Sequence, residues 1–263
     1  MPTITRISAQ KRAGRYNVDI DGQYAFPIAE STLIKYRLAK GVVLSAEQMA
    51  ALQHEDEGAR AFSKAVAYLS SSPRTVYQVR THLKDKEFAD EAIEAAIDRL
   101  ADMHYLDDAQ YAAEFLATNL RGGDRGPRAL AQWLRQRGID AYLIGDILAT
   151  QTDAQILTVA RRTAAKLLRQ SGSRSHGALV QRAQQTLMQK GFSRDVIEQA
   201  IELEEPEPDE EREDDLLREQ ASKLWRQKKQ YQGYERRMKV KQALYRKGFD
   251  LDAIDHVLDE LAE

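Results

Sequence analysis

The stretch from Gly126 to Ile139, Gly-Pro-Arg-Ala-Leu-Ala-Gln-Trp-Leu-Arg-Gln-Arg-Gly-Ile, decides how the chain folds. It has the features of one complete short helix. Pro127 suits the first helical position, where a missing N–H costs nothing. Leu130 and Leu134 belong to one apolar stripe, and Gly138 stands where a helix ends on a left-handed residue. The stretch therefore predicts a helix followed by a tight turn.

The end of this stretch recurs four times in the chain. Its copies are Leu83–Phe88, Leu134–Ile139, Leu187–Phe192 and Leu244–Phe249, at intervals of about fifty residues. Further apolar residues follow each copy at constant offsets, namely Ile93, Ile144, Ile197 and Ile254, and then Ile97, Leu148, Ile201 and Leu258. A fixed period of this kind is the signature of a tandem array.

We call the repeated stretch, with the apolar residues that follow it, the recurring frame. Each copy predicts a unit of three helices, in which the recurring frame ends the middle helix and continues through a turn into the third. The predicted fold class is mainly α: a tandem array of helix-turn-helix-like repeats, elongated and curved because repeats contact only their neighbours. The predicted repeats are residues 58–104, 105–152, 153–204 and 214–263, with 205–213 as an acidic linker. The first repeat has Glu87 in place of the glycine, so we expect its turn to differ locally.

Residues 1–57 predict a β-strand extension with short helices. Apolar residues alternate at period two over residues 3–28, which indicates three short strands. Asp21-Gly22 is a strong signal for a two-residue hairpin turn. One helix is expected from Glu30 to Leu38 and a second short one from about Ala46, with Ser45 as its N-cap. So small a sheet is marginal alone, so it should pack on its neighbour.

Composition excludes several classes of protein. The chain has 263 residues, a formal net charge of −2 and no cysteine, so neither a disulfide framework nor thiolate chemistry is available. No stretch approaches the length of a membrane-spanning helix, and the N-terminus lacks an apolar signal core, which predicts a soluble cytoplasmic protein without membrane contact. The five histidines are scattered without ligand spacing, so we expect no metal and no other cofactor.

Charge is segregated in the C-terminal third. Residues 202–215 hold ten acidic residues and one basic, whereas residues 223–247 hold ten basic residues and one acidic. The acidic run, with its two prolines, predicts an extended, mobile linker or a frayed helix end. The basic run exceeds what solubility needs and predicts salt-sensitive contacts with phosphates. We hypothesise that the acidic run competes for the basic one when no partner is bound.

A series of motifs resembles one known family. They are Ala65-Val-Ala-Tyr-Leu-Ser70, Arg74, Tyr105-Leu-Asp-Asp108 with Tyr111-Ala112, and Gly126-Pro-Arg with Leu134 and Gly138-Ile139. From about Gly58 to the C-terminus they resemble the signature of the RecX family of recombination regulators. The N-terminal strands look like the extension of RecX proteins in Gram-positive bacteria. The first repeat departs from the pattern with Gln78 and Val79, where an acidic residue and leucine are usual.

The resemblance implies a non-enzymatic regulator of homologous recombination, DNA repair and the SOS response. Such a protein binds the RecA recombinase filament on DNA, in its helical groove, and modulates filament assembly, ATP hydrolysis and strand exchange. The partners expected are therefore the RecA filament and single-stranded DNA, with double-stranded DNA left open. The chain is expected to be a monomer. The sign of its effect on RecA stays open.

Basic residues are the candidates for contact with RecA or DNA, because dispersed cations suit a groove binder that uses many weak contacts. Around Arg125 the segment 121–128 predicts a flexible basic loop, and it lacks the ending of a nucleotide-binding P-loop. Trp225, among the basic residues, is left open between base stacking and helix packing. The candidates are Arg74, Arg80, Arg121, Arg125, Arg128, Arg135, Arg137, Lys228, Lys229, Arg236, Arg237, Lys239 and Lys241.

Two other functions compete with this one. A sequence-specific helix-turn-helix transcription regulator would share the three-helix units, but third helices such as Asp90–Met103 and Leu251–Leu261 are acidic and poorly suited to a major groove. An enzyme would need a catalytic group. The adjacent carboxylates Asp107 and Asp108 are better explained as the N-cap and first-turn residues of a helix.

Overall fold

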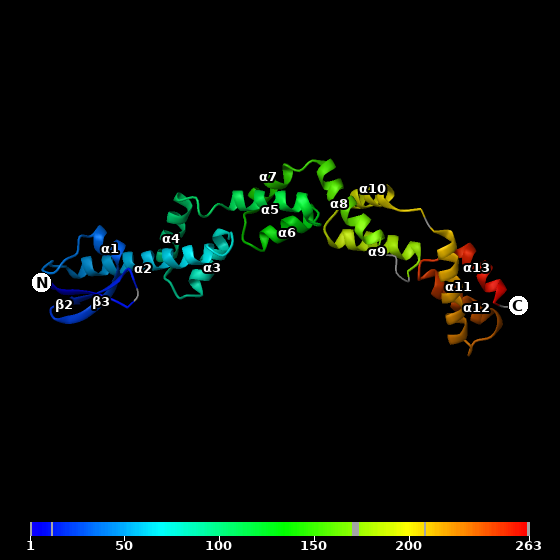
Figure 1. The fold of residues 1–263 in the computed structure, drawn as a ribbon, viewed down its shortest axis with the longest axis horizontal. Helices are drawn as coiled ribbons and strands as arrows, with labels where there is room; N and C mark the ends of the chain where they lie inside the picture. The colour runs from blue at the N-terminus through cyan, green and yellow to red at the C-terminus, as the bar shows by residue number, and fades with distance from the viewer. Residues whose placement is uncertain (1, 12, 170–173, 208, 262–263) are drawn as a thin grey trace. The chain divides into compact units, whose positions relative to one another are not determined.

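The computed structural model describes residues 2–11, 13–169, 174–207 and 209–261, and this part of the chain is mainly helical (Figure 1). Three strands and thirteen helices occur in it. They are β1 (Ile4–Ala9), β2 (Arg15–Ile20), β3 (Gln23–Ala29), α1 (Glu30–Lys35), α2 (Ala46–Leu69), α3 (Val76–Lys84), α4 (Asp90–Asp102), α5 (Asp108–Gly122), α6 (Pro127–Arg135), α7 (Ala141–Ala149), α8 (Asp153–Leu168), α9 (His176–Gln189), α10 (Arg194–Glu204), α11 (Glu210–Gln227), α12 (Gly233–Tyr245) and α13 (Leu251–Glu260). The predicted class, three-helix units in tandem with a small N-terminal sheet, is confirmed.

The chain divides into two compact units. The first consists of residues 1–113 and 134–143, and the second of residues 114–133 and 144–263. Helices α5, α6 and α7 contribute residues to both units.

The three predicted strands form an antiparallel sheet in the order β1-β2-β3. Asp21 and Gly22 both have positive φ, at 48° and 84°, and join β2 to β3 as the predicted two-residue turn. One face of the sheet is apolar, with Val18 and Ile28 fully buried. This face packs into a core with Leu52 of α2, which confirms that the sheet leans on its neighbour.

The long helix α2 replaces two predicted helices. It runs without a break from Ala46 to Leu69, so the expected interruption near Gly58 is wrong. A helix interior tolerates glycine at a cost of about 1 kcal/mol, and contacts on either side of Gly58 outweigh that cost. Asp56, which is 4% exposed, accepts from Arg15 Nη1 at 2.6 Å and also from the Ala29 N–H. These contacts fix the sheet to the middle of α2.

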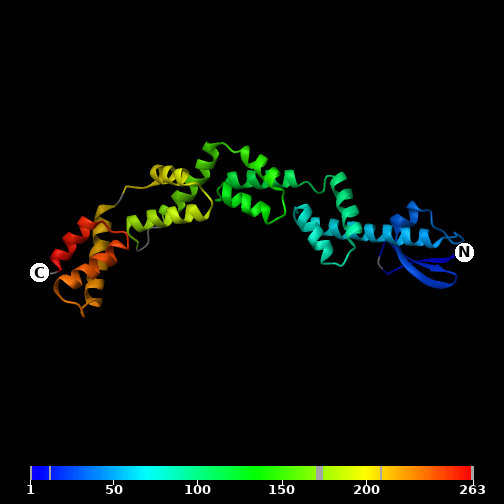
Figure 2. The same cartoon turned by 180° about the vertical axis from the view of Figure 1, so that it is seen from behind.

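The recurring frame forms the cores of the three-helix units. In the fourth repeat, α11, α12 and α13 contact one another in both views (Figures 1 and 2). Leu244, Phe249 and Ile254 are all buried there, and Leu187 and Phe192 are buried in the third repeat. Apolar residues at constant offsets are thus the cores that specify each repeat, as the sequence predicts.

The turn after each middle helix has the same backbone in all four repeats. Gly138, Gly191 and Gly248 have φ of +74°, +86° and +85°, and Glu87 has φ of +62°. In the first repeat Phe88 N–H donates to the Leu83 carbonyl, the bond that closes this type of helix end. The expectation that the first turn differs is therefore wrong, because glutamate adopts the left-handed conformation there.

The acidic run is partly helical. Helix α11 begins at Glu210, and its N-cap Asp209 accepts from the Arg212 N–H at 3.1 Å. Residues 210–213, placed in the predicted linker, therefore form the first turn of a helix, and residues 202–204 lie at the end of α10. Carboxylates are favourable in a first turn because they face the positive end of the helix dipole, and this offsets their mutual repulsion.

Candidate functional site

Neighbouring repeats are joined in the same way at three places. The N-terminus of one middle helix meets the turn after the next middle helix. In the first unit Thr75 Oγ1 donates to the Arg137 carbonyl at 2.6 Å. In the second unit the Gly126 N–H donates to the Lys190 carbonyl at 2.8 Å, and Ser175 Oγ donates to the Lys247 carbonyl. We call these contacts the repeat joints.

Each repeat joint requires a turn without a side chain. A Cβ on Gly248 would lie 2.5 Å from the Ala178 nitrogen, and one on Gly138 would overlap Tyr77. These distances are shorter than real Cβ contacts, so the docked helix would have to move. Glu87, the equivalent residue of the first repeat, has no earlier repeat docked on it in the described chain. A side chain is therefore tolerated at that one turn.

Acidic residues complete two of the repeat joints. Asp108 at the start of α5 accepts from the Val76 N–H at 2.9 Å, so it caps the middle helix of the preceding repeat. Burial raises the pKa of Asp108, and the bond from Val76 acts in the opposite direction. Glu213 caps α9 in the same way through the His176 N–H, at 3.0 and 3.1 Å. Asp108 thus lies in the first turn of α5, as predicted, and in addition caps the middle helix of the preceding repeat.

The loop before α6 is held on several sides. The buried Asn119 side chain accepts from the Arg125 N–H at 3.1 Å and donates to the Arg125 carbonyl at 2.8 Å. Asp124 forms an ion pair with Lys190 that lowers the pKa of the Asp124 carboxyl. The expectation of a flexible basic loop is wrong, because its backbone groups have fixed partners. It is a pre-organised loop.

Arg162 of α8 anchors the same loop from the third repeat. Its guanidinium donates to the carbonyls of Leu120 at 3.1 Å and of Asn119 at 3.2 Å, and also to those of Arg121 and Gly123. It thereby donates to carbonyls at the end of α5, where helical partners run out, although the Asn119 carbonyl also accepts from the Gly123 N–H. Neither Asn119 nor Arg162 stands out in the sequence. Asn119 bonds to backbone groups within a turn, and the carbonyls that Arg162 contacts are distant along the chain.

Four of the five candidates of the second repeat are exposed. In the second unit Arg121 Nη2 donates to Thr118 at 3.3 Å, and Arg125 lies 6.0 Å from the centre of the Phe115 ring. Arg128 in the second unit and Arg135 in the first make no side-chain hydrogen bond or ion pair with any described residue. Arg137, in the first unit, is half-buried, and its carbonyl is taken by Thr75.

In the first repeat, the two candidates have different roles. Arg80 makes a bidentate ion pair with Glu94, at 2.8 and 2.7 Å, which raises the Arg80 pKa and lowers that of Glu94. Its charge is therefore compensated within the repeat. Arg74 instead lies with its guanidinium 4.6 Å from the centre of the Tyr68 ring. Its charge has no carboxylate partner among the described residues.

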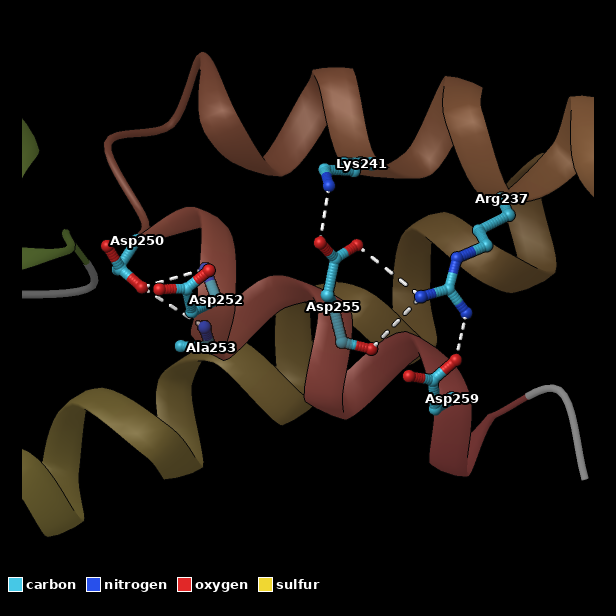
Figure 3. Close-up of polar contacts among 7 residues, drawn as sticks. All are labelled: Arg237, Lys241, Asp250, Asp252, Ala253, Asp255 and Asp259. Atoms are coloured by element: carbon cyan, nitrogen blue, oxygen red, sulfur yellow. Dashed lines mark hydrogen bonds and ion pairs between the residues drawn. The ribbon is translucent and has the colours of Figure 1, made fainter.

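Two candidates of the basic run pair with α13 (Figure 3). Arg237 contacts the carboxylates of Asp255, at 3.4 Å, and Asp259, and Lys241 contacts Asp255. Lys241 and then Arg237 lower the pKa of Asp255. Asp250 caps α13 as predicted, accepting from the backbone two and three residues on. The acidic third helix therefore neutralises much of the charge of α12.

The remaining candidates of the basic run lie outside this network. Arg236 stacks 4.3 Å from the Trp225 ring and donates to the Trp225 carbonyl, which closes the end of α11. Lys239 lies 5.5 Å from the Tyr231 ring centre. Lys228 and Lys229 form no ion pair within the described ranges, and no ion pair there links the acidic run to the basic one. The hypothesis of competition between the two runs gains no support.

The described residues include neither a metal-binding cluster nor a membrane-spanning helix. No group of three or more His, Cys, Asp or Glu residues there could hold a metal ion. None of the helices in those ranges is both long and apolar enough to cross a membrane.

Family models match most of the chain. The regulatory protein RecX N-terminal domain matches residues 2–45, the first three-helix domain of RecX residues 61–100, and the second residues 107–148. The third three-helix domain matches twice, at residues 153–201 and 210–258. The chain belongs to the RecX family. The double match shows that repeats three and four are two copies of one RecX domain type.

Curated relatives in the RecX family cover the chain from end to end. "Regulatory protein RecX" of Lacticaseibacillus casei is 43% identical over 263 residues, 100% of both chains. That of Bacillus subtilis is 39% identical over 261 residues, 99% of both. A crystal structure of regulatory protein RecX is 38% identical, with a TM-score of 0.64 over 77% of this chain and 100% of its own. RecX from Lactobacillus salivarius is 28% identical, with a TM-score of 0.51 over 56% and 96%.

Proposed function

We propose that the chain regulates homologous recombination and DNA repair by binding the RecA nucleoprotein filament and DNA. It changes filament assembly, ATP hydrolysis and strand exchange and catalyses no reaction of its own. Membership of the RecX family carries this proposal, because the curated relatives named above are called regulatory proteins and match the chain over its whole length. The protein acts as a monomer in the cytoplasm, where RecA filaments form on chromosomal DNA.

The loop before α6 supports a binding role. Asn119 and Arg162 fix its backbone, while Arg125 and Arg128 remain exposed. A pre-organised loop loses little conformational entropy when it binds, so more of its interaction energy is available for affinity. Arginine suits both phosphates and carboxylates, since its planar fork donates in pairs. The loop therefore fits a phosphate or an acidic side chain of a filament.

The distribution of charge narrows the set of candidate residues. Arg80, Arg237 and Lys241 have carboxylate partners within their own repeat. The functional contacts are assigned to the other cations, chiefly the loop arginines with Lys228 and Lys229. The helix-turn-helix alternative is disfavoured, because α13 would bring uncompensated Asp250 and Asp252 to a phosphate-lined groove.

The test is a titration of RecA ATP hydrolysis on single-stranded DNA with the full chain. We expect a changed rate at less than one chain per RecA monomer, because each bound chain acts on a cooperative filament. Arg125→Glu with Arg128→Glu should weaken the effect, whereas Arg194→Glu, whose arginine pairs with Glu198 on its own helix, should not. An unchanged rate with wild-type chain would contradict the proposal.

A further inference from the structure

Two stacked rings and an arginine beside them lie in the first repeat, in the first unit. The rings of Tyr68 in α2 and His82 in α3 are 4.1 Å apart and tilted by only 7°. The Arg74 guanidinium lies 4.6 Å from the Tyr68 ring centre. This contact with the Tyr68 ring reduces the rotational freedom of the guanidinium before a ligand arrives.

Uncompensated positive charge surrounds this stack. Burial lowers the pKa of His82, and the positive charges of Lys86, Lys64 and Arg74 lower it further, against an opposing effect of Asp85. Lys64 and Lys86 are exposed and make no ion pair with any residue the structure describes. This differs from Arg80, whose charge Glu94 neutralises. We call these five residues, Tyr68, His82, Arg74, Lys64 and Lys86, the first-repeat patch.

Several donors of the patch have no partner among the described residues. Neither Arg74 Nη makes a hydrogen bond there, and Arg74 Nε is also unpaired but is buried, so the Nη groups and the two lysines are the donors that can meet an anion. Lysines act as mobile point charges that suit phosphates, while a stacked arginine offers the edge of its fork. Flat rings beside cations are also the pattern that binds unpaired bases along a phosphate backbone. Phosphates with unpaired bases occur together in single-stranded nucleic acid.

The geometry points to the first-repeat patch as a binding site for single-stranded DNA, with phosphates on Lys64, Lys86 and Arg74. This inference rests on the proposed function, which requires contact with DNA in or beside the filament. It goes further by placing a DNA contact on the first repeat, in addition to the loop before α6 and the C-terminal basic run. Of its members only Arg74 stands among the residues that the sequence singles out.

Fluorescence anisotropy of a labelled single-stranded oligonucleotide tests the inference with the full chain at a series of salt concentrations. Each phosphate contact on a single strand contributes about 0.7 to the slope of log K against log salt, so Lys64→Gln with Lys86→Gln should lower that slope by about 1.4. The matched control is Lys35→Gln with Lys84→Gln. It removes the same charge from ammonium groups paired with Glu55 and Asp90, so its slope should stay that of the wild type.

Three results would overturn the inference. The first is equal slopes for the two double variants, and the second is no binding of the oligonucleotide by wild-type chain. The third is a Lys64→Gln, Lys86→Gln variant that binds DNA as the wild type does but has lost the effect on RecA ATP hydrolysis. The last would make the patch a protein-binding surface. In NMR, the oligonucleotide should raise the pKa of His82, because a phosphate offsets the three cations; no rise would also count against the site. If wild-type chain still alters RecA ATP hydrolysis, the regulation of RecA in the proposed function survives all of these results, whereas its DNA contact is contradicted when wild-type chain binds no oligonucleotide.

Discussion

Replacing Gly191 by alanine tests the repeat joint between the second and third repeats. Alanine at φ +86° costs roughly 1–2 kcal/mol relative to an ordinary conformation. Its Cβ would also meet Ala129, with the two Cβ atoms only 3.0 Å apart. The docked helix must then withdraw, which breaks the Gly126–Lys190 and Arg128–Gly191 backbone hydrogen bonds at about 1 kcal/mol each. Together these terms predict a loss of about 3 kcal/mol.

Urea unfolding measures this loss through the fluorescence of Trp133, which stacks on Phe115 at 3.6 Å close to the joint. Trp225→Phe in every variant removes the second signal. Gly145→Ala is the matched control, since a Cβ there meets nothing within 4 Å in a helix interior. It should gain up to about 1 kcal/mol. A loss below 1 kcal/mol for Gly191→Ala, or equal effects of the two substitutions, would refute the role assigned to the joint.

Three further outcomes are expected. Burial raises the pKa of Asp108, so the wild type should lose stability relative to Asp108→Asn as pH rises through and above about 4. Urea midpoints of the two proteins that change in parallel across that pH range would contradict this. Arg162→Met leaves several carbonyls without the arginine donor and should lower stability by about 2 kcal/mol. Arg161→Met loses one exposed ion pair and should lower it by at most about 1 kcal/mol. Faster hydrogen exchange of the loop before α6 in Arg162→Met than in Arg161→Met reports the difference. Lys229→Gln should weaken filament binding more than Arg237→Gln, because only the latter charge is compensated; the reverse order would show that the wrong cations were assigned.

The sequence predicts the repeats well because their cores depend on local period. Leu187 and Phe192 fall at offsets that a helix and its turn impose, and they are buried accordingly. Glu87 shows where this reasoning fails. The left-handed turn is local and survives substitution, whereas the need for glycine arises only when another helix docks on it. The residues in that contact are 62 apart along the chain for Thr75 and Arg137 and 72 apart for Ser175 and Lys247, so it leaves no local signal.

The candidate site is less predictable than the fold. The basic run looks uniform in sequence. In the structure, however, Arg237 and Lys241 form ion pairs with carboxylates of α13, whereas Lys229 has no such partner among the described residues. Pairing depends on which helix faces which, and this cannot be read from composition. The sequence does not single out Lys64 and Lys86 either, because each is one lysine among many. Only the fold places them beside the Tyr68–His82 stack.

The most direct test of the central claim is cosedimentation of the full chain with RecA filaments assembled on single-stranded DNA. RecA without DNA and the same DNA without RecA serve as references. If the chain regulates RecA on the filament, it should sediment with the filament at a chain concentration well below the one needed to bind RecA alone or DNA alone. If the chain stays in the supernatant with intact filaments, or binds only the DNA, the assignment of RecA as its partner is contradicted.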